Sequence, residues 1–263
     1  MANPTALITG ASGGIGEELA RVFAANGHDV VLAARSAAKL EALAAELSAK
    51  HKVRAYAVAA DLTDPKAPGQ LLERVAALGL TVDVLVNNAG FADFGEFHKS
   101  DLGKQLEMMQ VNMVALTELS HRVLPGMVAR RKGRILNVGS TGSFMPGPLM
   151  SVYYATKAFV LSVSEAWQEE LKGTGVSVTA LCPGPVATGF QKAAAMEGSR
   201  LLSNPMNPMM PVGVVAKEGY DALMAGKTIV IPGLMNRVLA VTPRLLPRRF
   251  VPAIVKQASV REH

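Results

Sequence analysis

Short runs of β-branched and aliphatic residues alternate along this chain with longer stretches of helical composition. Seven runs lie at residues 5–9, 29–33, 53–59, 82–86, 134–138, 176–181 and 228–231. Helical stretches separate most of them, at 16–26, 37–50, 65–78, 104–130 and 153–172. Parallel strands need a crossover connection, usually a helix, so this alternation predicts a parallel sheet with helices on both faces. We expect an α/β fold with a doubly wound sheet of seven parallel strands in three α/β/α layers.

Two segments interrupt the alternation. Residues 189–212 are rich in Met, Pro and Asn, and residues 233–263 continue beyond the last predicted strand. Prolines at 243, 247 and 252 predict that this extension forms short helices. Apolar residues make up 49% of the chain, enough for one large core, and no repeat or linker divides it. We therefore expect one domain over residues 1–263 with a C-terminal helical extension.

Cysteine content and charge bear on the compartment and on the partners. Cys182 is the only cysteine, so no internal disulfide forms, which indicates a reducing compartment. The start of the chain lacks the basic region of a signal peptide, and no apolar run is long enough to span a bilayer, so we expect a cytoplasmic protein. Of the net charge of +6, a net +5 falls in residues 233–263, which hold six basic residues and one acidic residue. The basic character therefore belongs to a tail and does not indicate nucleic-acid binding.

A glycine-rich turn joins the first predicted strand to the first helix. It reads Thr9-Gly10-Ala11-Ser12-Gly13-Gly14-Ile15-Gly16, with the spacing Gly-x-x-x-Gly-x-Gly. Glycines permit a tight turn and let backbone amides approach a pyrophosphate, which the helix dipole also attracts. We expect phosphate binding in a Rossmann-like fold; the alternative is a turn without a ligand. The expected binding residues of the turn are Gly10, Ser12, Gly14, Ile15 and Gly16.

The end of the second predicted strand bears on the choice of dinucleotide. An NAD site usually has an acidic residue there for the ribose 2′-hydroxyl, whereas this chain has Ala33-Ala34-Arg35-Ser36. The planar guanidinium of Arg35 suits a 2′-phosphate, so we expect NADP(H) rather than NAD(H). The alternative is a solvated Arg35, with Ser36 as the N-cap of the next helix.

Tyr153 and Lys157 lie four residues apart in a stretch that reads as helical. This spacing places both side chains on one face, where the ammonium would lower the pKa of the phenol. A tyrosine with a lowered pKa is a usable general acid or base. The alternative is a plain surface contact. Only Tyr153 has this spacing to Lys157, so we assign it in preference to Tyr154.

These features together resemble the short-chain dehydrogenase/reductase family, in its NADP-preferring bacterial branch, over about residues 5–231. The resemblance rests on the glycine turn, the run Asn87-Asn88-Ala89-Gly90, Ser140 after the fifth strand, the Tyr153–Lys157 pair and Pro183-Gly184 after the sixth strand. It implies further cofactor contacts after the third, fourth and sixth strands and at the tyrosine–lysine pair. They are Asp61, Leu62, Asn88, Ala89, Gly90, Tyr153, Lys157, Pro183, Gly184, Val186 and Thr188.

The resemblance also implies the reaction, a hydride transfer between NADP(H) and a carbonyl or alcohol group. Tyr153 would exchange a proton with the substrate oxygen, and Ser140 would hydrogen-bond the same oxygen. Lys157 would lower the Tyr153 pKa, and Asn112 would support a water that links Lys157 to solvent. Ser143 is interpreted as lining the pocket. A non-catalytic NADP-binding regulator on the same scaffold is the alternative, and it would be expected to lack Ser140, Tyr153 or Lys157.

Substrate and partners follow from the two irregular segments. In this family residues 189–212 would form a lid over the substrate, and their methionines and Phe190 favour an apolar acyl, steroid-like or aromatic ketone. The basic and apolar extension fits contact with an anionic membrane surface, or equally a cap on this subunit or a neighbour. By resemblance, the long helices 104–130 and 153–172 form a homodimer interface. No cluster of residues has metal-ligand spacing, so we expect no metal.

Overall fold

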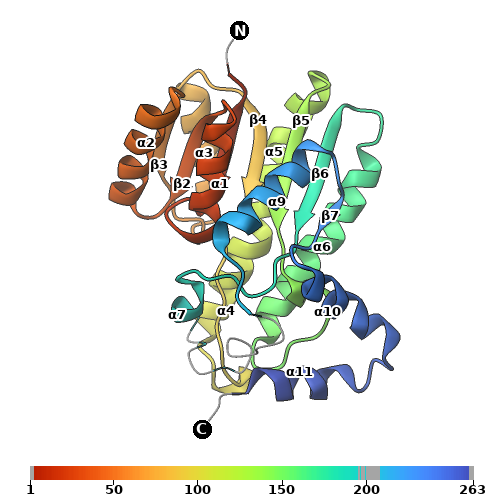
Figure 1. Cartoon of the computed structure of the whole chain (residues 1–263). Coiled ribbons are helices and arrows are strands. Elements are labelled where there is room, and N and C mark those ends of the chain that lie inside the picture. Colours follow the sequence, from red (N-terminus) through yellow and green to blue (C-terminus); the bar gives the residue numbers. More distant parts are fainter. Residues whose placement is uncertain (1–2, 195, 197–198, 200–207, 261–263) are drawn as a thin grey trace.

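The structure of the protein is a computed structural model that describes residues 3–194, 196, 199 and 208–260. Its described part contains one parallel sheet with the strand order β3-β2-β1-β4-β5-β6-β7 (Figure 1). The strands are β1 (Thr5–Thr9), β2 (Asp29–Ala34), β3 (Ala55–Ala59), β4 (Val82–Asn87), β5 (Gly133–Val138), β6 (Val176–Leu181) and β7 (Ile229–Val230). The order reverses between β1 and β4, and ligands of doubly wound sheets bind at the carboxyl ends of the strands at such a point.

Helices cover both faces of the sheet and extend beyond the carboxyl ends of its strands (Figure 1). They are α1 (Gly14–Ala25), α2 (Ala37–His51), α3 (Ala67–Ala77), α4 (Leu102–Met109), α5 (Leu116–Ala129), α6 (Ser151–Glu170), α7 (Phe190–Ala193), α9 (Val212–Met224), α10 (Leu234–Leu245) and α11 (Val251–Ser259). The predicted doubly wound three-layer fold is confirmed. Most predicted boundaries differ from the observed ones by no more than two residues.

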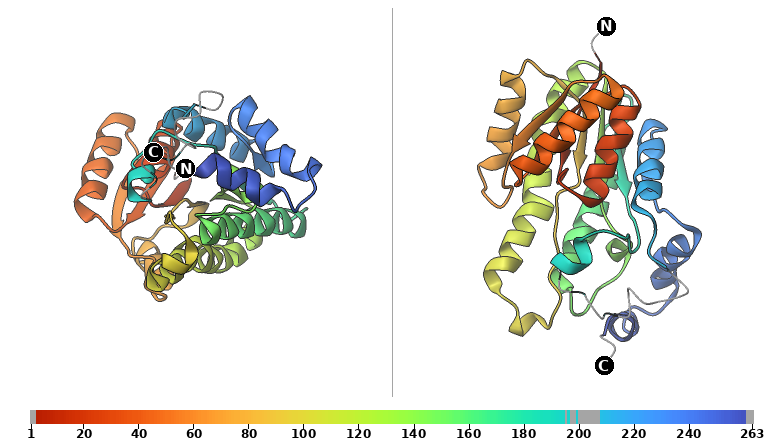
Figure 2. Two further views of the ribbon diagram at one scale, coloured as in Figure 1. Left: turned by 90° about the horizontal axis from the view of Figure 1, so that it is seen from below. Right: turned by 60° about the vertical axis from the view of Figure 1, so that its left-hand side comes forward.

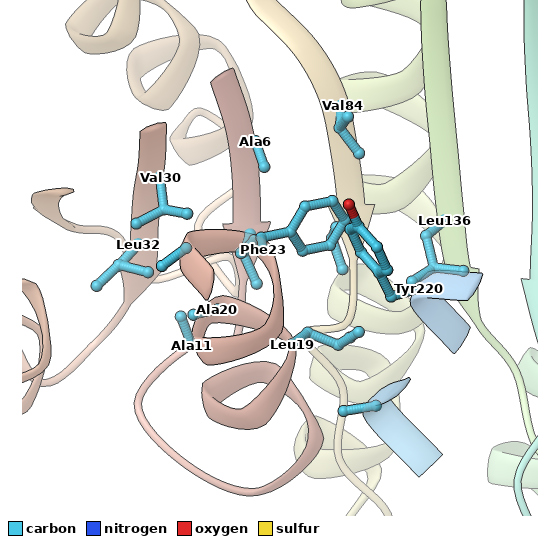
Figure 3. Packing of buried hydrophobic residues seen from close by; sticks show 14 of the residues in the cluster. Ala6, Ala11, Leu19, Ala20, Phe23, Val30, Leu32, Val84, Leu136 and Tyr220 are labelled. Atoms are coloured by element: carbon cyan, nitrogen blue, oxygen red, sulfur yellow. The ribbon is translucent and has the colours of Figure 1, made fainter. Parts of the chain in front are cut away.

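Each face of the sheet has its own apolar core. One core joins the sheet to α1, α2 and α9, and the other joins it to α3, α5 and α6. Phe23 of α1 is fully buried and meets Tyr220 of α9 edge to face, with ring centroids 5.0 Å apart (Figure 3). This packing fixes α1, and with it the glycine turn that precedes it, against the sheet.

The helix predicted over residues 104–130 is interrupted. A π-helical turn at Gln110–Ala115 separates α4 from α5. The turn carries Asn112, whose side chain is buried and fully engaged with polar groups of neighbouring segments. A π-turn accommodates one extra residue in a helix, a feature that composition does not reveal. The stretch 104–130 is therefore helical as predicted, and the change of helix type at Gln110–Ala115 is the part that was not predicted.

The C-terminal extension forms two helices, as the prolines predicted. α10 and α11 lie at the carboxyl end of the sheet, the end away from the N-terminus (Figure 2). The inner face of α11 packs Val251 and Val255 into an apolar cluster with Met150 and Tyr154. Of the predicted lid, residues 195, 197, 198 and 200–207 lie outside the described residues.

Candidate active site

The glycine turn is held tightly against the end of β4. A Cβ atom at Gly10 would lie 2.7 Å from the Asn88 side-chain nitrogen, and one at Gly16 would lie 2.4 Å from the Gly10 carbonyl oxygen. Gly10 also has a φ of 66°, in the left-handed region that favours glycine. The turn therefore requires glycine at both positions. Its close approach brings the first amides of α1, which have no partners within the helix, to the switch point of the sheet.

Hydrogen bonds made by Thr9 and Asn88 hold this turn against the end of β4. The buried Thr9 hydroxyl donates to the Val86 carbonyl oxygen over 3.1 Å and accepts the amides of Asn88 and Ala89, each at 3.0 Å. The Asn88 side chain donates to the carbonyl oxygens of Thr9 and Gly10 at 2.9 and 3.2 Å. In this structure the Asn88 side chain therefore shapes the turn, while its neighbours Ala89 and Gly90 face the adjacent cavity.

A cavity of about 430 Å³ opens beside the turn. Seven predicted cofactor residues line it, namely Gly10, Ser12, Arg35, Asp61, Leu62, Ala89 and Gly90. Lys39 of α2 also lines it and was missed, although its place in the first turn of the helix that follows Arg35 could have indicated a second cation there. Ser36 lines the cavity as well and is the N-cap residue of α2, as the alternative predicted, although its side chain makes no capping hydrogen bond.

The segment after β6 lies across from the glycine turn. A Cβ atom at Gly14 would lie 3.3 Å from the Thr188 methyl carbon, so the end of the segment faces the start of α1. Val186 is buried and bridges to Met210. At Gly184 a Cβ atom would lie 2.1 Å from the Asn236 side-chain oxygen, so α10 presses on the Pro183-Gly184 turn. These predicted residues do not line the 430 Å³ cavity, and the Val186 carbonyl oxygen accepts a hydrogen bond from the side chain of Gln191 in α7.

Ser140 follows β5 and begins a 3-10 turn at Thr141–Phe144. Its hydroxyl accepts the Gly142 amide over 3.0 Å, and its own amide donates to the Ser143 hydroxyl over 3.2 Å. Ser143 is buried. The interpretation of Ser143 as a pocket-lining residue was therefore wrong, because its hydroxyl closes a reciprocal cap that orients Ser140.

Tyr153 and Tyr154 project differently from α6. Tyr153 is half-buried and hydrogen-bonded to the Ser140 side chain, and its ring lies 5.7 Å from that of Phe190 of α7. Tyr154 is buried, and a Cβ atom at Gly147 would lie 2.2 Å from its ring. The geometry thus gives Tyr153 the contact with Ser140 and makes Tyr154 a packing residue.

Lys157 completes the group from the next turn of α6. Its buried ammonium donates to the Val138 carbonyl oxygen over 2.7 Å and lies 5.8 Å from the centroid of the Tyr153 ring. A Cβ atom at Gly90 would lie 3.5 Å from the ammonium nitrogen and 3.0 Å from the Asn112 side-chain oxygen. The backbone of Gly90 therefore lies between the cavity and these two polar groups, the Lys157 ammonium and the Asn112 side chain.

The pKa values correct one prediction. Burial raises the pKa of the Tyr153 phenol, and the hydrogen bond with Ser140 offsets this only in part. Burial also lowers the pKa of Lys157 to about 8. The prediction that Lys157 holds the Tyr153 pKa below its ordinary value was wrong for this geometry. Burial removes the phenolate from water, and this cost is the largest influence on the Tyr153 pKa.

Asn112 makes hydrogen bonds to two other segments that border the site. Its amide nitrogen donates to the Phe91 carbonyl oxygen at 3.1 Å and to the Thr156 hydroxyl at 3.0 Å. Its oxygen accepts the Phe91 amide at 3.1 Å. Asn112 therefore ties the segment after β4 to α6, one residue before Lys157. The predicted link through water from Asn112 to Lys157 stays a prediction.

Comparison with known proteins adds a family to this geometry. The family model described as short chain dehydrogenase matches residues 4–197, which confirms the resemblance found in the motifs. A very-long-chain 3-oxoacyl-CoA reductase of Bos taurus is 38% identical over 191 residues, which are 71% of this chain and 61% of that protein. The chain thus spans less than two thirds of the length of this relative.

Solved structures match over nearly the whole chain. A short-chain dehydrogenase from Sphingobium yanoikuyae, in complex with NADPH, has a TM-score of 0.82 at 33% identity, covering 98% of this chain and 96% of the other. A bulky-bulky ketone specific alcohol dehydrogenase from Comamonas testosteroni has a TM-score of 0.77 at 29% identity, covering 96% of this chain and 100% of the other. Both likenesses cover a larger share of the chain than the part matched by the family model.

Proposed function

We propose that this chain, which belongs to the short-chain dehydrogenase family, reduces the carbonyl group of an apolar substrate with NADPH at Tyr153. Members of this family are NAD(P)-dependent oxidoreductases that act between CH–OH and C=O groups, and so is this chain. The observation that carries the finer proposal is the meeting of Ser140, Tyr153 and Lys157 beside the cavity at the switch point.

The cavity fits the adenosine phosphate end of NADP(H). Glycines 10 and 16 leave no room for side chains between the turn and β4, and a Cβ atom at Gly13 would meet only open space. Arg35 and Lys39 bring two cations to the end of β2, where an NAD site usually has a carboxylate. Two cations at this place support a 2′-phosphate, and the NADPH complex of the Sphingobium enzyme points the same way.

Three side chains would handle the carbonyl oxygen. Bound NADPH supplies a hydride, which carries two electrons to the carbonyl carbon. Tyr153 donates the balancing proton to the oxygen, and the Ser140 hydroxyl hydrogen-bonds the same oxygen and directs it. Because its pKa is raised, Tyr153 is protonated at neutral pH, as a proton donor must be.

The surroundings of Tyr153 support an apolar substrate. Its ring packs against a cluster drawn from α6, α11 and the segments after β4 and β6. The cluster contains Ala92, Met150, Tyr154, Ala194, Met196, Val251 and Val255, with Phe94, Met145 and Phe190 beside it. A large apolar group next to the reacting carbonyl would therefore bury surface against carbon and sulfur atoms. The names of the bovine and Comamonas relatives, which denote long-chain acyl and bulky ketone substrates, agree with this class.

NADPH oxidation across a graded ketone panel tests the substrate class. The panel runs from a small polar hydroxyketone through an aromatic ketone to medium-chain and long-chain 3-oxoacyl thioesters. We expect kcat/KM to rise with apolar size, and the half-buried Met145→Gln to lower it by roughly tenfold for the largest substrate only. Faster turnover of the small polar ketone would contradict the proposal. Saturable NADPH binding without oxidation by any member of the panel would favour the non-catalytic alternative.

The cofactor is tested separately by replacing the two cations. Arg35→Ala and Lys39→Ala are each expected to raise the Kd of NADPH by about tenfold, because each removes one phosphate contact, while the Kd of NADH stays unchanged. The exposed Arg131→Ala, on the opposite end of the sheet, serves as the charge-matched control. Equal losses for NADH and NADPH would show that the cations do not read the 2′-phosphate.

A further inference from the structure

The outer face of α10 exposes an apolar stripe. Leu234, Val238, Val241 and Leu245 follow one another at spacings of four, three and four residues, which places them on one side of the helix. Leu234 and Leu245 are 77% and 79% exposed, and the other two are about half exposed. The opposite side of the same helix is buried at Asn236 and Ala240. The inner face of α10 therefore accounts for its folding, and no contact among the described residues covers the stripe.

Basic residues flank this stripe. Arg237 and Arg244 lie four residues before and three residues after Val241, so they line one edge of it. Arg248 and Arg249 follow in the connection to α11, and all four are exposed. Residues 234–259 contain five basic residues and no acidic one. An exposed helix with an apolar stripe and a cationic edge has the composition of helices that lie in a bilayer interface.

We propose that α10, together with the connection to α11, is a docking surface for an anionic lipid bilayer. Charge complementarity selects this occupant: phosphate headgroups would meet the arginines while the stripe enters the boundary between headgroups and acyl chains. A second copy of the chain would bring four arginines against another four, which opposes pairing through this face. Within the described residues no helix is long and apolar enough to cross a membrane, so the contact is peripheral.

The position of the surface relates it to the site. α7, α10 and α11 lie together at the carboxyl end of the sheet (Figures 1 and 2). The inner face of α11 belongs to the apolar cluster against which Tyr153 packs. At its end, the Ser259 carbonyl oxygen accepts the hydroxyl of Ser199, a residue of the predicted lid, over 2.9 Å. A docked bilayer would therefore lie next to the elements that surround the reacting tyrosine. Binding to lipid does not itself depend on the proposed reaction.

Vesicle flotation of the full chain tests this surface. Vesicles of phosphatidylcholine, with and without phosphatidylglycerol, are mixed with the wild type and with the variants V238Q/L245Q and R248E/R249E. We expect binding to phosphatidylglycerol vesicles, little binding to phosphatidylcholine alone, and a loss of roughly tenfold or more in each variant. K50E/K66E changes two exposed lysines elsewhere, alters the net charge by the same amount, and is expected to bind like the wild type.

Three results would overturn the proposal. They are equal flotation of the wild type and a folded V238Q/L245Q, equal loss in K50E/K66E, and equal binding to vesicles with and without phosphatidylglycerol. A circular-dichroism melt establishes that each variant is folded, which we expect because all the substituted residues are exposed. Light scattering adds a further arm: if V238Q/L245Q changes the oligomeric state, the stripe is a contact between copies and the lipid proposal is wrong.

Discussion

The Lys157 ammonium donates a hydrogen bond of 2.7 Å to the carbonyl oxygen of Val138, the last residue of β5. Ser140 follows two residues later, and Tyr153 stands one helical turn before Lys157. The end of one central strand therefore sets the positions of all three side chains. The contact also explains why a buried lysine is tolerated, because the ammonium keeps a polar partner after it has lost water.

Tyr153→Phe is expected to lower kcat for NADPH-dependent ketone reduction by about 10²- to 10⁴-fold, the usual contribution of a general acid. The Kd of NADPH should stay near the wild-type value, because the ring and its packing remain. Stopped-flow hydride transfer and fluorescence titration of NADPH measure the two effects. Tyr154→Phe is the matched control: its ring packs against Gly147, and its turnover should be nearly normal. Normal turnover of Tyr153→Phe would show that Tyr153 is not the proton donor.

Lys157→Met tests the buried charge through stability. The folded pKa is about 8 and the ordinary value is 10.5, so in this window the unfolded chain keeps a proton that the folded protein has released. The free energy of unfolding of the wild type should therefore rise with pH, relative to the variant, by up to about 1.4 kcal/mol per pH unit. Below about pH 8 the lysine is charged in both states, and its burial destabilises the folded wild type by a constant amount. Above pH 10.5 it is neutral in both states, and the difference in free energy of unfolding between wild type and variant is again constant.

Urea unfolding at several pH values across this window measures the effect. Lys172→Met, which removes an exposed lysine on the segment after α6, controls for the general loss of a positive charge. If the free energies of unfolding of the wild type and of Lys157→Met change with pH in the same way, the pKa of Lys157 is not lowered in the folded protein.

The fold was predictable because its determinants are local. Strands such as Thr5–Thr9 are buried on both sides and therefore read as continuous apolar runs, and the glycine turn follows β1 directly. The motifs also indicated Ser140, Tyr153 and Lys157, which the structure brings together. The direction of the Tyr153 pKa was not predictable, because it depends on burial by α7 and α11, segments distant in the sequence. The π-turn at Asn112 depends likewise on tertiary contacts. The cap from Ser143 to Ser140 is local, because the two residues are three apart, and it was overlooked in the sequence.

Ser143→Ala is expected to lower kcat by about tenfold with little change in KM, because the Ser140 amide loses the acceptor that orients its residue. A role through Ser140 predicts non-additivity: in the Ser140→Ala background the same change should have almost no further effect on kcat. Full additivity in this double-mutant cycle would mean that Ser143 acts independently of Ser140. Thermal melts of the four proteins separate loss of orientation from loss of stability.

Leu106→Glu tests the predicted homodimer. Leu102, Leu106 and Met109 form an exposed apolar stripe on α4, and a shallow hollow beyond it is lined by residues of α5 and by Phe159 of α6. Burying this surface against a second copy would remove it from water, so a carboxylate at its centre should dissociate the dimer into monomers. Light scattering after size exclusion measures the mass. Leu78→Glu, at a comparably exposed leucine after α3, should leave the dimer intact, because its surroundings carry no such stripe. A wild type that is monomeric, or a dimer unaffected by Leu106→Glu, would place the interface elsewhere or remove it.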